Sequence, residues 1–135
     1  MATNNVANSV NEAEERAKKE AEEKRKAEER AKLRSEISSL KSRREKLQQE
    51  YNLKVEEQDE AKELFNKQIE LLDAIDSSNR NKTYNAAPAY IQEQIYGENY
   101  SSFISSYSNV MEAIQDEIDS VNSEISAKET QLSNI

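Results

Sequence analysis

Carboxylates are the only side chains in this sequence that are numerous enough to suggest acid–base or metal chemistry. Neighbouring pairs such as Glu56–Glu57 and Asp116–Glu117 could share a proton. General acid–base catalysis needs a carboxyl group whose pKa is raised by an apolar setting, whereas these pairs fall on the surface of predicted helices. We therefore predict no catalytic residues and no enzymatic activity.

The best-spaced candidates for metal ligands are Glu112, Asp116 and Asp119, which share one face of a predicted helix. A calcium site needs a loop that wraps oxygen ligands around the ion, and no such loop adjoins them. The sequence also lacks histidine and cysteine, which removes disulfides, thiolate chemistry and the usual zinc sites. With no glycine-rich phosphate loop either, we predict no metal and no cofactor.

The composition predicts an all-α protein with one domain. The 135 residues include one glycine and one proline, and 35% are hydrophobic while 34% are charged. Turn-rich β-folds and dinucleotide-binding folds need glycine at tight connections. Abundant alanine, glutamate, lysine and glutamine are typical of long helices or coiled coils instead.

The net charge of −8 is unevenly placed along the chain. Residues 88–135 carry eight acidic side chains against Lys128 alone. Such a segment repels phosphate backbones and anionic lipid, so we predict neither nucleic-acid binding nor membrane insertion. Residues 1–16 contain neither the basic nor the apolar region of a Sec-type signal peptide. We expect a cytoplasmic protein that, if it leaves the cell, does so folded or as part of a complex.

The first third of the chain reads as a tail followed by a charged helix. We predict that residues 1–9 are disordered, because capping-box patterns place a helix start near residues 10–12. Within the segment 10–32, residues 12–32 contain no apolar side chain larger than alanine, but they carry i,i+4 acid-to-base pairs such as Glu22–Lys26. This segment is predicted to be a solvated single-helix extension, or alternatively a charged docking arm.

Helix one of the predicted domain 33–135 spans residues 33–76. Its seam begins with apolar residues three, four or seven apart, then reaches Lys54, Gln58 and Ala61, where we expect the seam to drift around the helix. Residues 77–87 are turn-forming and make the predicted loop. The apolar residues of this pattern are Leu33, Ile37, Leu40, Leu47 and Tyr51 before the drift, and Phe65, Ile69, Leu72 and Ile75 after it, where apolar residues resume at Leu64 beside the seam.

Helix two, residues 88–133, begins at Pro88, which suits the first position of a helix. It carries the strongest structural pattern, a strict 3-4 repeat that is apolar at eight of nine positions. A short loop between two long helices predicts an antiparallel, coiled-coil-like hairpin with a long charged N-terminal helical extension. The repeat comprises Ile104, Tyr107, Met111, Ile114, Ile118, Val121, Ile125, Lys128 and Leu132.

Two helices cannot cover all the apolar residues of this chain. Leu53, Leu64 and Leu71 lie off the main line of helix one, and Tyr96, Phe103 and Val110 lie beside the seam of helix two. Exposed apolar area forfeits about 25 cal/mol per Å². We therefore expect a partner, either a second copy or another helical protein.

The stretch from Gln94 to Tyr107 concentrates aromatic residues on one helical face around the chain's only glycine. The rings could form a wide core layer near the hairpin turn, or a protein-binding face, because large aromatics dominate binding hot spots. Gly97 and Pro88 are the predicted kink and turn positions. The predicted partner-binding residues are Tyr96, Tyr100, Phe103, Tyr107, Met111, Ile114 and Ile118.

A helical hairpin without a signal peptide, with an aromatic–glycine element near the start of helix two, resembles the WXG-type small proteins of the Gram-positive type VII secretion system. It is most similar to the α-helical proteins associated with LXG toxins. Tyr96-Gly97 stands in place of the family's Trp-x-Gly element, with Tyr100 and Phe103 following. The tryptophan and the intervening residue are absent. The resemblance covers about residues 31–135 as a pattern.

The resemblance implies a non-enzymatic adaptor, or targeting chaperone, that binds the helical N-terminal domain of an LXG toxin. A second small helical protein often joins such complexes, which are exported together. Family export signals of the Tyr-x-x-x-Asp/Glu type do not follow the tyrosines of residues 94–107, so the partner would supply that signal. The alternative is an autonomous structural coiled coil that forms a homo-oligomeric bundle.

Overall fold

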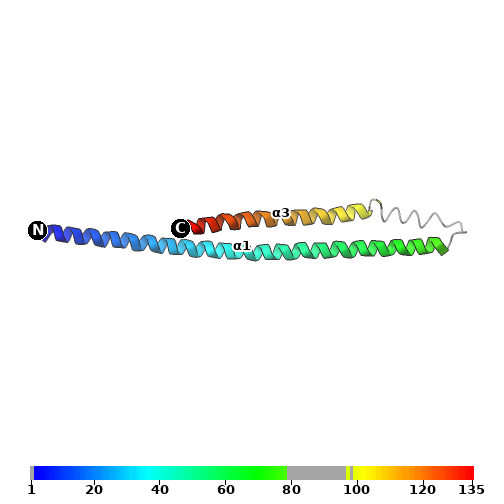
Figure 1. Cartoon of the computed structure of the whole chain (residues 1–135), viewed down its shortest axis with the longest axis horizontal. Coiled ribbons are helices and arrows are strands. Elements are labelled where there is room, and N and C mark those ends of the chain that lie inside the picture. Colours follow the sequence, from blue (N-terminus) through cyan, green and yellow to red (C-terminus); the bar gives the residue numbers. More distant parts are fainter. Residues whose placement is uncertain (1, 79–96, 98) are drawn as a thin grey trace. The chain divides into compact units, whose positions relative to one another are not determined.

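The protein is an all-α helical hairpin in the residues that its computed structural model describes. These are residues 2–78, 97 and 99–135, with side chains described from residue 6 to 75, at 97 and from 99 onward. Helix α1 spans Ala2–Ser78 and helix α3 spans Tyr100–Ser133 (Figure 1). The two helices pack against each other, and the described residues contain no strand. This confirms the predicted fold class.

Helix α1 joins three segments that the sequence pattern separates. The predicted tail 1–9, the charged extension 10–32 and helix one 33–76 together form one helix that begins at Ala2 and ends at Ser78. The expectation of a disordered tail therefore differs from the structure, in which residues 2–9 are helical. The physical reason is that a nucleated helix gains one hydrogen bond for each residue added, and no glycine or proline interrupts residues 2–78.

The hairpin divides into two units, each made of one part of α1 and one part of α3. The terminal unit comprises Met1–Arg43 and Val121–Ile135, and the aromatic unit comprises Arg44–Ser120. Pairing in each is antiparallel. In the terminal unit Arg30 contacts Ile135 while Glu36 contacts Lys128.

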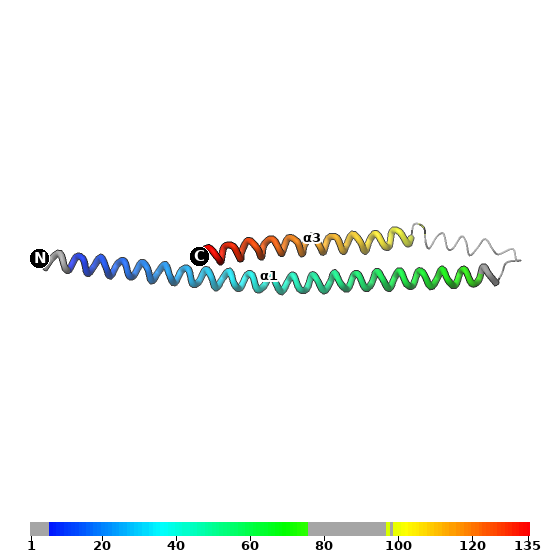
Figure 2. The backbone as a smooth tube through the Cα atoms, viewed as in Figure 1, coloured from blue at the N-terminus to red at the C-terminus, as the bar shows by residue number. Residues whose placement is uncertain are grey.

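The terminal unit has a narrow apolar core bordered by ion pairs. Its core consists of Leu33 and Ile37 from α1 with Val121 and Ile125 from α3. Upstream of this core the side chains of residues 6–25 are all exposed, and α1 continues past the end of α3 (Figure 2). Within the predicted extension 10–32, residues 10–25 are therefore helical with exposed side chains, which fits both a solvated helix and a docking arm.

The 3-4 repeat of α3 is confirmed at every position. All nine side chains are buried or half-buried, including the single polar member, Lys128. Lys128 fits because its Nζ atom lies 2.8 Å from a carboxylate oxygen of Glu36 on α1. A lysine stem can cover apolar surface while its ammonium group stays hydrated and paired.

The seam of α1 does not drift where the sequence suggested. Lys54 and Ala61 are half-buried and Gln58 is 7% exposed, so the seam keeps its 3-4 spacing through these residues to Phe65. The seam shifts later, at Phe65. The spacing from Ala61 to Phe65 is four residues and the spacing from Phe65 to Ile69 is again four, where the repeat calls for three; Leu72 then follows after three. The polar residues therefore occupy the seam rather than displacing it.

Gln58 is tolerated in the seam because its amide is hydrogen-bonded. Its Nε2 atom donates to the carbonyl oxygen of Ile104 and to the hydroxyl of Ser108, both at 3.2 Å. A buried amide with partners avoids the desolvation penalty of an unsatisfied one. In coiled coils such a polar residue also favours one register over its alternatives.

The structure describes the predicted helix two, residues 88–133, only from its later part, so its predicted start at Pro88 stays a prediction. Helix α3 begins at Tyr100, and Gly97 and Asn99 adopt π-helical conformation just before it. Gly97 has no positive φ, and a Cβ atom there would meet nothing within 4 Å. Nothing in its surroundings therefore requires glycine. Pro88 and the predicted loop beyond Ser78 lie outside the described residues.

Two matched valine substitutions test the core of α3. Val121 is 2% exposed and Val110 is 45% exposed. We expect Val121→Ala to lower the free energy of unfolding by about 2 kcal/mol, from lost burial and a small cavity. Val110→Ala should be neutral or slightly stabilising, because alanine is the better helix former. Urea unfolding followed by circular dichroism measures both, and equal effects would contradict the assigned burial.

Replacing Gln58 by leucine tests its role in pairing. We expect Gln58→Leu to change the free energy of unfolding by no more than about 1 kcal/mol, because leucine burial offsets the lost hydrogen bonds. The variant should populate additional oligomeric species, since the register constraint is gone. Light scattering after size-exclusion chromatography detects them. Gln49→Leu, at an exposed position of α1, is the control, and a Gln58→Leu protein with unchanged species would rule out this role.

Candidate protein-binding face

The predicted partner-binding residues divide between the core and the surface. Ile118 is 4% exposed, while Tyr107, Met111 and Ile114 are half-buried in the same seam. Their 3-4 spacing matches that of the seam residues of α1. Because α1 belongs to the same chain, it is present at high effective concentration and covers them in preference to another protein. Ile118 is therefore covered by the chain's own core. Tyr96 lies outside the described residues.

An aromatic cluster connects the core to the surface in the aromatic unit. The ring of Phe65 on α1 lies edge-on to Tyr100, with ring centroids 5.0 Å apart, and 5.8 Å from Phe103. Phe103 also lies 5.0 Å from Tyr107. Such tilted and edge-to-face geometries are favourable for aromatic pairs. Phe103 nonetheless remains 37% exposed, so the cluster combines features of both alternatives that the sequence left open.

Polar groups next to this cluster connect Tyr107 to α1. Lys54 Nζ lies 3.1 Å from a carboxylate oxygen of Glu57. Burial of Tyr107, followed by a hydrogen bond to Glu57 and the negative charge of that carboxylate, raises the pKa of the tyrosine. The neutral hydroxyl is therefore favoured and can donate to Glu57. These contacts hold Tyr107 at the edge of the seam.

A shallow hollow between the helices shows which side of α1 adjoins which side of α3. It is lined by Lys54 of α1 and by Ser106, Tyr107 and Val110 of α3. Because Lys54 pairs with Glu57, the side of α1 that carries Glu57 adjoins the side of α3 that carries Val110. Antiparallel pairing explains this, because it brings equivalent flanks of the two heptad repeats together.

Large apolar residues occupy this shared side. Leu64 and Leu71 follow Glu57 at intervals of seven residues, so they continue its stripe along α1. Phe103 precedes Val110 by seven residues on α3. Leu64 is 59% and Leu71 65% exposed. We call the exposed set the apolar flank, which comprises Leu53, Leu64, Leu71 and Ile75 of α1 with Phe103 and Val110 of α3.

Most residues of the apolar flank could be predicted from the sequence, because they occupy positions outside the 3-4 repeat of the seam. Ile75 could not, because its spacing continues the seam pattern, yet it is 47% exposed. The later shift of the α1 seam, after Phe65, accounts for this. Ile75 also lies four residues from Leu71, on the same face of the helix.

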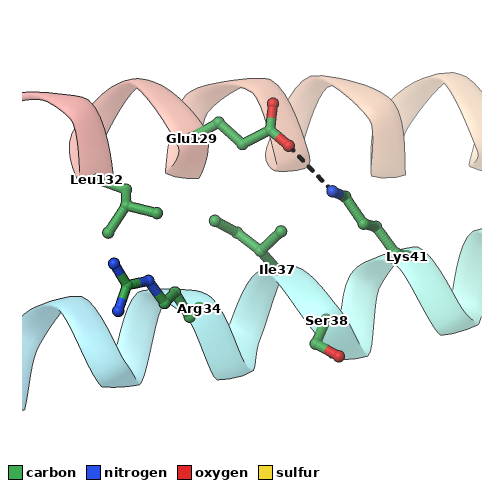
Figure 3. Close-up of a pocket in the computed structure, with 6 residues that line it drawn as sticks. All are labelled: Arg34, Ile37, Ser38, Lys41, Glu129 and Leu132. Atoms are coloured by element: carbon green, nitrogen blue, oxygen red, sulfur yellow. Dashed lines mark ion pairs between the residues drawn. The ribbon is translucent and has the colours of Figure 1, made fainter.

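The terminal unit has a different surface feature, a groove of about 410 Å³. Ile37 and Leu132 lie between the helices there, and Lys41 and Glu129 form an ion pair of 3.3 Å across them (Figure 3). Ser38 points away from α3 (Figure 3). Arg34 completes the lining. This is the edge of the seam, where Ile37 is buried and Leu132 is half-buried.

Neither unit provides an obvious setting for metal chemistry. Among the residues described, no three acidic, histidine or cysteine side chains are grouped so that they could hold a metal ion. Helices α1 and α3 also contain no segment that is long and apolar enough to cross a membrane.

Comparison with known proteins leaves the family open, since no family model, curated protein or solved structure matches this chain.

The Glu36–Lys128 pair gives the terminal unit a defined response to acid. The ammonium group of Lys128 donates a hydrogen bond to the Glu36 carboxylate, which lowers the pKa of Glu36 from the ordinary value of 4.5. A carboxyl group with a lowered pKa stabilises the fold above its unfolded pKa, and that contribution is lost as pH falls through the folded pKa.

We therefore expect Glu36→Gln to lower the melting temperature at about pH 7 and to have little effect at about pH 2.5, where the wild-type carboxyl is protonated. Thermal unfolding at both pH values measures the difference. Glu124→Gln, which removes an exposed carboxylate of α3, is the control. A Glu36→Gln effect that is the same at both pH values would mean that the ion pair does not contribute.

Proposed function

We propose that this protein is a non-enzymatic adaptor, or targeting chaperone, that binds a helical domain of another protein. The observation that carries the proposal is the apolar flank, which remains exposed although the seam between α1 and α3 is closed. Soluble proteins seldom leave several large apolar side chains exposed on one side, and such surfaces commonly mark interaction sites.

The spacing of the apolar flank favours a helix as the bound element. On α1 the four apolar residues and Glu57 follow each other at intervals of four, seven, seven and four residues, which is the pattern of one helical face. Phe103 and Val110 supply a parallel row on α3. A third helix lying between the two rows would complete a three-helix arrangement and remove both from water.

The partner we propose is the helical N-terminal domain of an LXG toxin, on the basis of the resemblance carried by Tyr96-Gly97, Tyr100 and Phe103. A second small helical protein would share the complex. In this function the adaptor covers apolar surface of the toxin before export by the type VII system, and the complex leaves the cell together. The exposed edge of Phe103 would then contact the toxin, while Tyr100 and Tyr107 support it from the seam.

The second candidate function is a structural coiled coil made of several copies of this chain. It is favoured by the strict 3-4 repeat of α3, which is typical of autonomous coiled coils. The two functions differ in what covers the apolar flank. A homo-oligomer would bury it without a partner, whereas an adaptor would be monomeric or weakly associated when purified alone.

Substitutions on the apolar flank test the adaptor function. We expect Leu64→Ser combined with Leu71→Ser to weaken binding to the purified LXG domain by about 100-fold or more, because each buried leucine contributes about 1.5–3 kcal/mol. Calorimetric titration measures the affinity. The matched control is Val6→Ser with Val10→Ser, which changes exposed apolar residues of the same helix outside the apolar flank.

Circular dichroism should show unchanged helix content in both double variants, since all four positions are exposed. If both variants bind the LXG domain as the wild type does, the apolar flank is not the binding site. If the wild type fails to bind and is a stable oligomer, the structural coiled coil is the better assignment.

A further inference from the structure

The two units of the protein differ sharply in charge. In the full sequence, the aromatic unit, residues 44–120, carries sixteen acidic and seven basic side chains, a net charge of −9. The terminal unit carries eleven acidic and twelve basic side chains, a net charge of +1. The negative charge is therefore concentrated in the unit that also carries the apolar flank.

Within the aromatic unit, carboxylates run alongside the apolar flank. On α1 a row of glutamates, with spacings of four, three and seven residues, lies beside Leu64 and Leu71 on the side away from the seam. Lys67 is the one basic residue in this row. On α3, Asp116 and Glu117 continue the acidic border beyond Val110. The acidic residues of the α1 row are Glu56, Glu60, Glu63 and Glu70.

We infer that the helix accepted by the apolar flank is amphipathic, with an apolar stripe bordered by lysine or arginine. This inference rests on the proposed function and adds the chemistry of the partner. An apolar stripe with a row of carboxylates beside it matches an apolar stripe with a row of cations beside it in both hydrophobicity and charge. Such complementarity accelerates association and excludes acidic helices, because like charges would face each other.

A second copy of this chain fits the apolar flank poorly. Face-to-face pairing would bring two units of charge −9 together along their acidic borders. Pairing with the terminal unit of another copy avoids that repulsion, but the large apolar residues exposed there are only Val6 and Val10 among the described side chains. Charge and apolar content together therefore favour a different, basic helix.

Synthetic peptides of three heptads provide the direct test. One carries leucine at the core positions with lysine at the flanking positions, and a second has glutamate in place of lysine. A third keeps the composition of the first with the order scrambled, so that it has charge without an apolar stripe. We expect the lysine-flanked peptide to bind the full chain at least 100-fold more tightly than the glutamate-flanked one and at least 10-fold more tightly than the scrambled one, by fluorescence anisotropy.

Charge variants of the protein distinguish binding through the glutamates beside the apolar flank from nonspecific electrostatic attraction to the whole chain. Glu56→Gln with Glu60→Gln should weaken binding of the lysine-flanked peptide about 10-fold at low salt. Glu14→Gln with Glu20→Gln, which removes two exposed carboxylates from the charged extension, should change it less than about 2-fold. Leu64→Ser with Leu71→Ser should abolish the advantage of the amphipathic peptide over the scrambled one.

Three results would overturn the inference. The first is equal binding of lysine-flanked and glutamate-flanked peptides. The second is equal sensitivity to the two charge variants, which would indicate nonspecific attraction. The third is a homodimer in sedimentation experiments that is broken by Leu64→Ser with Leu71→Ser, which would identify a second copy as the occupant.

The inference and the proposed function can fail separately. If the LXG domain binds and depends on Leu64 and Leu71 but not on Glu56 and Glu60, the adaptor function stands and the basic character of the partner is wrong. If the lysine-flanked peptide behaves as expected and the LXG domain does not bind, the partner chemistry stands and the toxin assignment is wrong.

Discussion

A pair of helices can bury only one stripe of each helix, and the organisation of this protein depends on that limit. The seam between α1 and α3 encloses a short row of buried side chains such as Ile37, Val121 and Ile125. Apolar residues beyond the stripe have no place in the core, so they remain on its edges. The exposed row formed by Leu64, Leu71, Phe103 and their neighbours is therefore a consequence of pairing two helices instead of three or four.

Polar residues inside the seam show how a narrow core can still specify one pairing. Gln58 is hydrogen-bonded across the helices, and Lys128 is paired with Glu36. Each would be costly in an alternative register that removed its partner. These two residues lie in different units, so each unit contains a polar contact that favours the observed alignment of α1 with α3.

Charge and apolar surface serve different purposes in the two units. In the terminal unit acids and bases nearly balance, which suits a solvated helix and ion pairs such as Lys41–Glu129. In the aromatic unit acidic side chains outnumber basic ones, and carboxylates border the exposed leucines. Under the proposed function, such a border would oppose self-association and leave the apolar flank open to a helix of opposite charge.

The sequence by itself determined the helices and the seam of α3, because hydrophobic periodicity is a local property that survives without knowledge of the partner helix. It also identified Leu53, Leu64 and Leu71 as residues outside the seam. Only the tertiary structure decided that they share one side with Phe103 and Val110, that Gln58 is buried, and that Ile75 is exposed. The reason is that these features depend on the orientation and register of two helices far apart in the chain, which set which flanks coincide and which side chains find partners.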